Sequence, residues 1–491
     1  MASLAELRTE RLRKLALWRE HGAEAYPVSA QQDFSLTQVL SDFTKLSKRK
    51  KALTVAGRVR AIRGQGSILF LDLDDGTEKL QLVAKSDEMD AKLFELFRDV
   101  IDVGDFIEAS GSLFITKREE KSLAVKTWRL LGKSLRPLPD KWHGLQDVEE
   151  RFRRRYLDIM MSPPVRTKLE TRSRLITAIR KFFNQHGYLE VETPILQALA
   201  GGATARPFVT HHEALDTDFN LRIAQELYLK KLLVGGLNRV YEIGRIFRNE
   251  GIDTTHNPEF TMLESQEAYA DATSQREFVE KLFKYLVKAI FGTDTLEYNN
   301  EKINFAPKFS VVGFFDLLKR YALIPDPANA TRRELELKAS QLGVAVEPSE
   351  ATEKIMDNIY KKVCRPKLLQ PTFIIDYPVG FNPFAKRKAD DPRFIDRFQL
   401  VIVGLEMVNA FSELNDPVEQ AERYREQDQK REGGEGEISP SDQDYLEAME
   451  YGMPPNGGIG IGIDRLAMLF TDTSNIKEVI FFPTLKPKNE K

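Results

Sequence analysis

Charged and aromatic side chains are concentrated between residues 242 and 264 of this 491-residue chain. Arginine binds a phosphate or a carboxylate through a planar pair of N–H donors. Glutamate accepts hydrogen bonds from an amino group, and histidine or phenylalanine can flank an aromatic base. The stretch contains all of these residue types: Arg245, Arg248, Glu250, His256, Phe260 and Glu264. The combination indicates a site for a nucleotide beside a carboxylate, and the alternative is a charged hairpin with solvated ion pairs.

Two strands and a turn must position these side chains. Apolar residues dominate Arg239–Phe247, which predicts a buried strand. Gly251 and Pro258 are typical turn residues, and a second strand is predicted over residues 260–263. Two apolar strands around a charged loop predict a β-hairpin that carries the candidate site.

The hairpin resembles a known family. Residues 247–251 read Phe-Arg-Asn-Glu-Gly, and residues 256–261 read His-Asn-Pro-Glu-Phe-Thr. This pattern closely resembles the second signature of the class II aminoacyl-tRNA synthetases in its lysyl form. The resemblance extends along the chain in the family's order. It implies an α+β fold: an antiparallel sheet with flanking helices, preceded by an N-terminal all-β OB-type barrel.

Length and composition set limits on the class of protein. The chain is too long for one ordinary core, so two or more domains are expected. A net charge of −2 excludes a basic field over the whole chain, so nucleic acid must be bound by local patches. Cys364 is the only cysteine, which excludes an intramolecular disulfide and fits a reducing cytoplasm. No apolar run approaches the length of a membrane span, so we expect a cytoplasmic protein without membrane contact.

The N-terminal part is expected to hold a helical segment and a small β domain. Residues 1–52 are predicted to be mainly helical, with a basic run at residues 48–51 that forms either a solvated face or a nucleic-acid contact. Residues 53–136 contain five short predicted strands punctuated by glycines. A helical stretch, Asp87–Arg98, lies between the third and fourth strands. This order predicts an OB-type barrel, a fold that commonly binds single-stranded nucleic acid.

An aromatic residue on the second predicted strand of this barrel is a candidate base contact. Phe70 lies near Arg58 and could stack on a base, although the spacing alone favours Phe70 as a core residue. The segment resembles the anticodon-binding domain of lysyl- and aspartyl-type synthetases, in which Phe70 matches the stacking aromatic. Asp74 stands where that pattern has a base-reading glutamine, and a carboxylate can only accept hydrogen bonds.

A linker over residues 137–150 is predicted to lead into an aminoacylation domain over residues 151–491, with a helical insertion near residues 325–366. Four arginines between Arg151 and Asp158 predict a solvated helix face, and contact with a tRNA backbone is the alternative. The predicted helix Thr167–Gly187 and the short strand after it resemble the first class II signature, which implies a homodimer.

Glycine and isoleucine alternate near the C-terminus, between Gly457 and Asp464. One face of such a strand is bare, so a ligand can approach its backbone closely. The stretch resembles the third class II signature, in which the arginine matched by Arg465 binds the γ-phosphate of ATP.

Polar groups interrupt the apolar stretch of residues 397–416. They are Glu406, Asn409 and Glu413. Buried carboxylates are unfavourable unless they are paired. A divalent metal ion with a triphosphate, or a cationic substrate, would supply a partner, and internal hydrogen bonding is the alternative.

The resemblance implies ATP-dependent activation of L-lysine to lysyl-adenylate and transfer to the 3′ end of tRNA(Lys), with Mg²⁺ as cofactor. The implied ATP-binding residues are Arg248, Glu250, His256, Asn257, Phe260, Glu406 and Arg465. Arg248 and Arg465 are also the implied catalytic residues. The implied lysine-binding residues are Gly202, Glu226, Arg248, Glu264, Asn409, Phe411 and Glu413. The implied Mg²⁺ ligands are Glu406 and Glu413, and the implied anticodon contacts are Phe70 and Arg58.

Five residues of the larger domain depart from the lysyl pattern. Gln225, Thr255, Gln266, Gln399 and Leu405 stand where proline, arginine, tyrosine, glutamate and arginine are expected. These departures leave two other hypotheses open. The chain could be an aminoacyl ligase with an acceptor other than tRNA, or a weakly active paralogue that serves as a binding module.

Overall fold

The computed structural model describes residues 3–49, 51–64, 66–139, 145–348, 350–432 and 440–488. The chain divides into two compact units, residues 1–144 and residues 145–491. Residues 140–144 of the predicted linker lie outside the described part of the chain. The last residues of that linker are helical, because helix α5 (Val148–Arg153) begins there.

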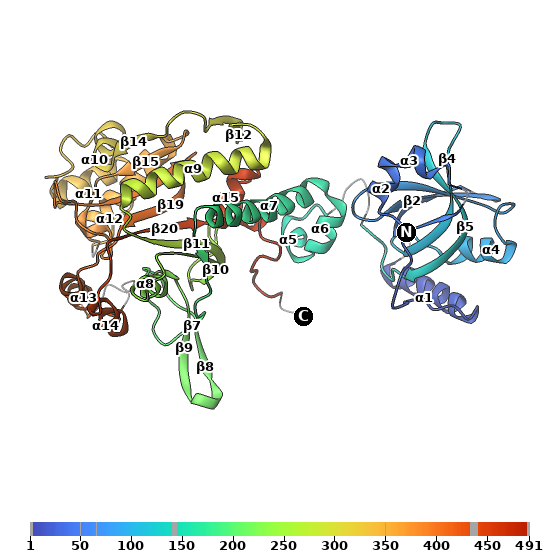
Figure 1. Ribbon diagram of the computed structural model, residues 1–491, viewed down its shortest axis with the longest axis horizontal. Helices are drawn as coiled ribbons and strands as arrows, with labels where there is room; N and C mark the ends of the chain where they lie inside the picture. The colour runs from blue at the N-terminus through green and yellow to red at the C-terminus, as the bar shows by residue number, and fades with distance from the viewer. Residues whose placement is uncertain are drawn as a thin grey trace. The chain divides into compact units, whose positions relative to one another are not determined.

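The first unit is a closed five-stranded barrel in the strand order β1-β2-β3-β5-β4 (Figure 1). Its elements are α1 (Leu4–Glu20), α2 (Leu36–Ser41), α3 (Phe43–Leu46), β1 (Leu53–Arg63), β2 (Ile68–Asp74), β3 (Lys79–Lys85), α4 (Ala91–Val100), β4 (Phe106–Ile115) and β5 (Lys121–Gly132). Helix α4 lies between β3 and β4 in the sequence, and the predicted OB-type barrel is therefore confirmed. Helix α1 packs against it through Trp18, whose ring centroid lies 4.7 Å from that of Trp128.

The second unit is organised around an eight-stranded sheet in the order β14-β15-β18-β19-β20-β11-β10-β6. The bounds of these strands are β6 (Leu189–Glu190), β10 (Arg239–Phe247), β11 (Glu259–Ala268), β14 (Ser310–Gly313), β15 (Thr372–Ile375), β18 (Arg397–Ile402), β19 (Leu405–Ser412) and β20 (Asn456–Gly462). All neighbours are antiparallel except the outermost pairs, β14–β15 and β10–β6. The predicted antiparallel sheet with flanking helices is confirmed.

Helices cover one face of this sheet. The helices whose side chains pack on that face include α7 (Pro163–Gln185), α9 (Ala272–Phe291) and α15 (Ile463–Phe470). The unit also contains α6 (Arg155–Met161), α8 (Glu226–Val234), α13 (Pro417–Glu432) and α14 (Gln443–Glu450). Figure 1 shows α7 and α9 running across the sheet. Phe183, Leu282 and Leu466, from α7, α9 and α15, share one buried core with Ile461 of β20. Because that face is packed with apolar side chains, a ligand must bind elsewhere on the sheet.

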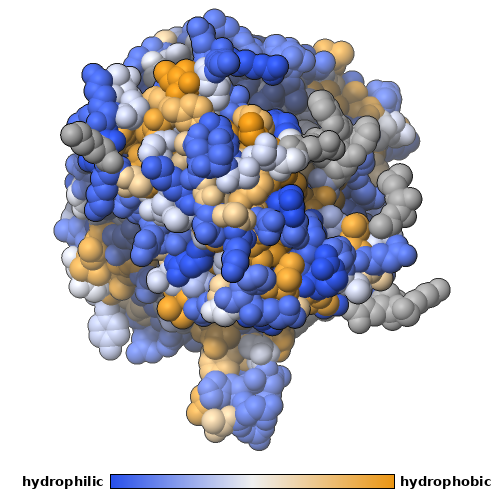
Figure 2. All heavy atoms as spheres, turned by 90° about the vertical axis from the view of Figure 1, so that its right-hand side faces the viewer, coloured by the Kyte–Doolittle hydropathy of each residue, from blue (hydrophilic) through white to orange (hydrophobic). Residues whose placement is uncertain are grey.

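Two smaller parts extend from the sheet. Helices α11 (Arg332–Gln341) and α12 (Thr352–Ile359) lie in the predicted insertion and share a second core with α14. The strands β7 (Leu196–Gln197), β9 (Thr217–Leu221) and β8 (Val209–His212) form an arm at the bottom of Figures 1 and 2. Val209 and Leu215 are exposed on it. No helix within the described residues is long and apolar enough to cross a membrane.

The prediction of a solvated arginine face at the start of this unit is wrong for Arg155. Its side chain is fully buried and pairs with Asp158 at 2.8 Å. It also donates hydrogen bonds to the backbone carbonyls of Lys477, Ile480 and Phe481. Arg155 therefore fastens the C-terminal segment to α6, since buried carbonyls need donors.

Candidate active site

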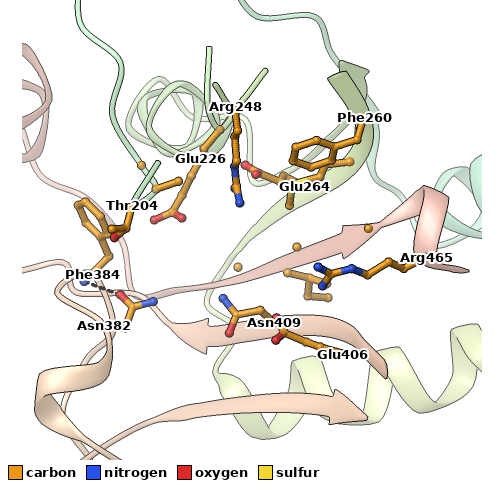
Figure 3. A pocket seen from close by; sticks show the side chains of 18 of the residues that line it. Thr204, Glu226, Arg248, Phe260, Glu264, Asn382, Phe384, Glu406, Asn409 and Arg465 are labelled. Carbon is orange, nitrogen blue, oxygen red and sulfur yellow. Dashed lines mark hydrogen bonds between the residues drawn. The ribbon is translucent and has the colours of Figure 1, made fainter. Parts of the chain in front are cut away.

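The candidate site is a cavity of about 380 Å³ on the sheet face opposite the helices α7 and α9, within the usual range for a small-molecule site. Side chains reach it from the β10–β11 hairpin, from β19 and β20, and from the loops around residues 202–204 and 381–384 (Figure 3). All predicted ATP-binding and lysine-binding residues line it: Gly202, Glu226, Arg248, Glu250, His256, Asn257, Phe260, Glu264, Glu406, Asn409, Phe411, Glu413 and Arg465. Arg245 does not line it: its side chain is exposed and pairs with Glu259 at 3.4 Å.

The hairpin fixes Arg248 at the cavity wall. β10 and β11 pair in register from Arg239 with Glu267 to Phe247 with Glu259, so Arg248 follows directly on the last paired residue. Its guanidinium lies 5.2 Å from the ring centroid of Phe260 and donates weakly to the carbonyl of Ile223 at 3.4 Å. Burial lowers the pKa of Arg248 from its usual value, and a partly desolvated guanidinium binds an anion strongly.

Arg465 approaches the same cavity from the first turn of α15. Its Nη2 lies 3.1 Å from Nε2 of His256, and Nδ1 of His256 lies 2.8 Å from the carboxylate of Asp253. Although burial opposes the shift, the N–H of Thr255 and the imidazole of His256 lower the pKa of Asp253 to about 2. The carboxylate thus keeps a proton on Nδ1, so that Nε2 can accept from Arg465 and hold its guanidinium in place.

Two more carboxylates line the cavity: Figure 3 shows Glu226 on the side away from Arg465 and Glu264 between Arg248 and Phe260. Glu264 is 8% exposed and accepts a hydrogen bond from the backbone N–H of Gln225 at 3.0 Å. Within the described residues no Lys or Arg forms an ion pair with it. Burial, and then the charge of Glu226, raise the pKa of Glu264 to about 8. This carboxyl group is therefore suited to receive a cation from a ligand.

Glu226 and Glu413 are already paired with a protein cation. The ammonium of Lys230, which is fully buried on α8, lies 2.5 Å from Glu226 Oε1 and 2.5 Å from Glu413 Oε2. The remaining oxygen of Glu413 accepts from Nε2 of Gln266 at 2.7 Å. Sequence reasoning missed Lys230. The four-residue spacing between Glu226 and Lys230 on a helix was the available signal for half of this arrangement.

The bare glycine face of β20 makes room for this arrangement. Met262 of β11 pairs with Gly462, and Ala410 of β19 pairs with Ile459, which places β20 between the two strands that carry the acidic residues. A Cβ added to Gly458 would lie 2.2 Å from Oε1 of Glu413. Only glycine at this position allows the backbone to approach so closely.

The structure does not bring together the two predicted Mg²⁺ ligands, Glu406 and Glu413. They lie at opposite ends of β19, about 23 Å apart along the strand at roughly 3.3 Å per residue. Both oxygens of Glu413 are also engaged by Lys230 and Gln266. The prediction of a shared metal site is corrected accordingly, and the alternative of internal pairing holds for Glu413.

Glu406 alone of this pair remains suitable for Mg²⁺. Figure 3 shows it on the same side of the cavity as Arg465. Gln399 is buried outside the cavity, and its side-chain oxygen accepts from the hydroxyl of Tyr377 at 2.7 Å. The described residues contain no group of three His, Cys, Asp or Glu side chains that could hold a metal ion. One carboxylate beside a phosphate site fits Mg²⁺, which is often bound by one or two carboxylates, substrate phosphates and water.

The barrel of the first unit presents its own polar face. Along β2, Leu69, Leu71 and Leu73 point into the core, whereas Phe70 alternates with them and is only half-buried. The interpretation of Phe70 as a core residue is therefore wrong. Arg58 lies on β1, its guanidinium 4.0 Å from the ring centroid of Phe106.

Asp74, the residue that departs from the anticodon-binding pattern, lies on the same side of β2 as Phe70. One of its oxygens accepts from the backbone N–H of Gly76 at 2.8 Å. The other lies 3.7 Å from Nε of Arg60. This carboxylate is thus held by neighbouring groups of the barrel.

Comparison with known families agrees with this architecture. Residues 147–486 match the family model of class II tRNA synthetases (D, K and N). Residues 53–131 match an OB-fold nucleic acid binding domain. The chain belongs to the class II tRNA synthetases of the D, K and N group.

Relatives along the whole length specify the branch. The lysine–tRNA ligase of Pelotomaculum thermopropionicum is 45% identical over 487 residues, which cover 99% of this chain and 96% of the relative. Those of Dehalococcoides mccartyi and Moorella thermoacetica are each 46% identical, over 490 and 485 residues. These matches cover 99% of this chain and 98% and 99% of the relatives. The resemblance to the lysyl branch is confirmed.

Proposed function

We propose that this protein is a lysine–tRNA ligase, which activates L-lysine with ATP and transfers it to the 3′ end of tRNA(Lys). One observation carries the proposal: Arg248 and Arg465 line a single cavity whose far end is acidic. Two guanidinium groups suit the two ends of a triphosphate, and the carboxylates suit the ammonium groups of lysine. An acidic end disfavours amino acids with neutral side chains, since a buried unpaired carboxylate is unfavourable.

The reaction needs no side-chain nucleophile. In the first step the carboxylate of lysine attacks the α-phosphate of ATP, the bond to the β-phosphate breaks, and pyrophosphate leaves. In the second step a hydroxyl group of the terminal ribose of tRNA attacks the lysyl carbonyl, and AMP leaves. The protein contributes positioning and charge neutralisation.

The residues at the ATP end of the cavity have the following proposed roles. Arg248 holds the lysine carboxylate against the α-phosphate, and Glu250 accepts from the adenine amino group. Phe260 stacks on the adenine, and Asn257 supports the turn by donating to the carbonyl of Glu259 at 2.6 Å. Arg465 and His256 hold the γ-phosphate end.

The lysine end of the cavity is formed by several elements. Gly202 has a backbone φ of +83°, and an added Cβ there would lie 3.2 Å from Cβ of Ala224 and 3.4 Å from Cβ of Glu226, so glycine lets this loop approach the lysine end closely. Glu226 and Glu264 receive the ammonium groups. Asn409, whose side-chain oxygen accepts from Arg397 at 2.8 Å, and Phe411 shape the wall beside the side chain of lysine.

We also propose that Mg²⁺ binds at Glu406, where it would neutralise the charge of the triphosphate. The edge strand β6 and the segment after it expose Leu189, Ile195 and Leu196, which supports the proposal of a homodimer through this region. In the barrel, the outward ring of Phe70, together with Arg58, is proposed to contact the anticodon.

Pyrophosphate exchange measured with each of the twenty amino acids, followed by charging of bulk tRNA, tests the function. The proposal expects exchange with lysine and charging of tRNA(Lys). Exchange without charging would favour an acceptor other than tRNA. The absence of exchange with any amino acid would favour a binding module and contradict the proposal.

Glu264 gives this activity a defined pH dependence. Its pKa of about 8 in the free protein means that it is largely protonated at pH 6.5 and ionised above pH 8. Only the ionised form pairs with an ammonium group, so kcat/KM for lysine should rise with pH and level off near pH 8 to 9. In Glu264→Gln this rise should be clearly smaller; part of it should remain, because burial also raises the pKa of Glu413 to about 8. A wild-type profile that is flat between pH 6.5 and 8 would contradict the role of Glu264.

A further inference from the structure

Lys230 lies behind the cavity wall. Among the described residues of α8, it is the one whose side chain forms ion pairs with two carboxylates, those of Glu226 and Glu413. Glu226 begins α8, and Glu413 directly follows β19. The side chain of Lys230 is fully buried and does not line the cavity. It is therefore placed to act on a ligand only through the two carboxylates.

Aromatic rings complete the surroundings of this ammonium group. Its Nζ lies 5.1, 5.6 and 5.8 Å from the ring centroids of Phe384, Phe411 and Tyr445. These rings come from the loop beside the cavity, from β19 and from α14. At such distances the ring faces stabilise a cation that has been removed from water. The carboxylates of Glu226 and Glu413 raise the pKa of Lys230 well above its ordinary value, although burial opposes them.

The charges of the cavity can now be counted for the proposed substrate. Glu226, Glu264 and Glu413 contribute three negative charges when ionised, and Lys230 offsets one of them. Two negative charges remain for the α- and ε-ammonium groups of lysine, and the carboxylate of lysine faces Arg248. Without Lys230, three carboxylates would share one buried region with two ligand cations, and close like charges repel strongly there.

We propose that Lys230 is a positioning residue that determines specificity: it fixes Glu226 and Glu413 and sets the negative charge of the cavity to match the two ammonium groups of lysine. The inference rests on the proposed function. Glu413 itself lines the cavity, and each of its oxygens, although in contact with Lys230 or Gln266, can accept a further hydrogen bond.

Lys230→Met tests the proposal, since methionine keeps the length of the side chain and removes its charge. In pyrophosphate exchange with the full-length protein, the KM for lysine should rise about tenfold or more, as loss of one partner of a buried ion pair implies. The KM for ATP should change less than about threefold, because the triphosphate end is held by other residues. Lys231→Met is the matched control: Lys231 is the next residue of α8 but pairs with the exposed Asp444 at 3.0 Å. It should leave both KM values unchanged.

The double variant Lys230→Met/Glu413→Gln separates charge balance from simple loss of packing. Removing the carboxylate that Lys230→Met leaves unpaired should recover most of the lost affinity for lysine. A double variant that is no better than Lys230→Met would overturn the proposal, because the charge of Glu413 would then be needed by the substrate itself. An equal rise of both KM values in Lys230→Met would also overturn it.

Two further measurements cover the remaining outcomes. If Lys230→Met does not fold, Tyr445→Leu removes one ring around the ammonium without touching the cavity lining. An unchanged KM for lysine in that variant would overturn the proposal. If the wild-type protein shows no lysine-dependent exchange, the proposed function fails. The pairing of Lys230 with Glu226 and Glu413 is then tested by the midpoint temperature of thermal unfolding. Lys230→Met should lower this temperature, and the double variant should restore part of the loss.

Discussion

Replacing Arg248 by alanine should slow lysine-dependent pyrophosphate exchange by about 10²–10³-fold, the usual effect of removing one preorganised donor from a developing charge. The guanidinium follows the last paired residue of a rigid hairpin and is partly desolvated against Phe260. It therefore needs little reorganisation when the lysine carboxylate and the α-phosphate meet. The loss should appear in kcat as well as in kcat/KM, because the contact strengthens as the pentavalent phosphorus forms.

Arg245→Ala provides the matched control for this experiment. Arg245 lies on the same hairpin, three residues before Arg248, but within the described part of the chain its one ion pair is to the exposed Glu259. Its replacement should change exchange by less than about twofold, as is typical of an exposed ion pair. Near-normal exchange in Arg248→Ala, or equal losses in both variants, would contradict the role assigned to Arg248.

Removing the first unit should separate the two half-reactions. Residues 145–491 form a compact unit with its own core and contain every residue that lines the cavity. A protein of these residues should retain pyrophosphate exchange with lysine within a few-fold of the full chain. Charging of tRNA(Lys) should fall below detection, because the proposed anticodon contacts are absent.

Phe70→Ala in the full-length protein is the finer version of the same test. Stacking of one base on an aromatic ring contributes about 1–3 kcal/mol, so kcat/KM for tRNA should fall about fivefold or more. Exchange should not change, since no tRNA takes part in it. If the shortened protein still charges tRNA, or if Phe70→Ala leaves charging intact, the barrel is not the tRNA-binding part.

Local patterns were enough to predict the main elements. The apolar run Arg239–Phe247 and the alternating glycines near Gly458 each correspond to a strand, β10 and β20, because burial on one face imposes a period that the sequence records. The candidates of the hairpin and of residues 397–416 were indicated by their residue types, whereas the remaining candidates and the individual roles came from resemblance. The structure places all thirteen of the ATP- and lysine-binding candidates around one space.

Other features depended on contacts between distant segments. The pairing of Lys230 with Glu413 joins residues 183 positions apart, and no local period marks it. Arg155 is buried because it donates hydrogen bonds to backbone carbonyls more than 300 residues away in the sequence. Phe70 faces outward because side chains alternate between the two faces of β2, and its neighbours Leu69 and Leu71 point into the core. Because phenylalanine is hydrophobic, its residue type alone suggested a core position. The separation of Glu406 from Glu413, in contrast, could have been estimated from strand rise alone.

Binding of ATP and of a non-hydrolysable lysyl-adenylate analogue to Arg465→Ala, measured by calorimetry beside Arg248→Ala, tests the central claim most directly. The analogue has no β- or γ-phosphate. Arg465→Ala should therefore weaken ATP about tenfold to a hundredfold, the range for a hydrogen bond to a charged group, and leave the analogue unaffected. Arg248→Ala should weaken both ligands. If Arg465→Ala weakens both ligands equally, the two arginines do not hold opposite ends of one triphosphate.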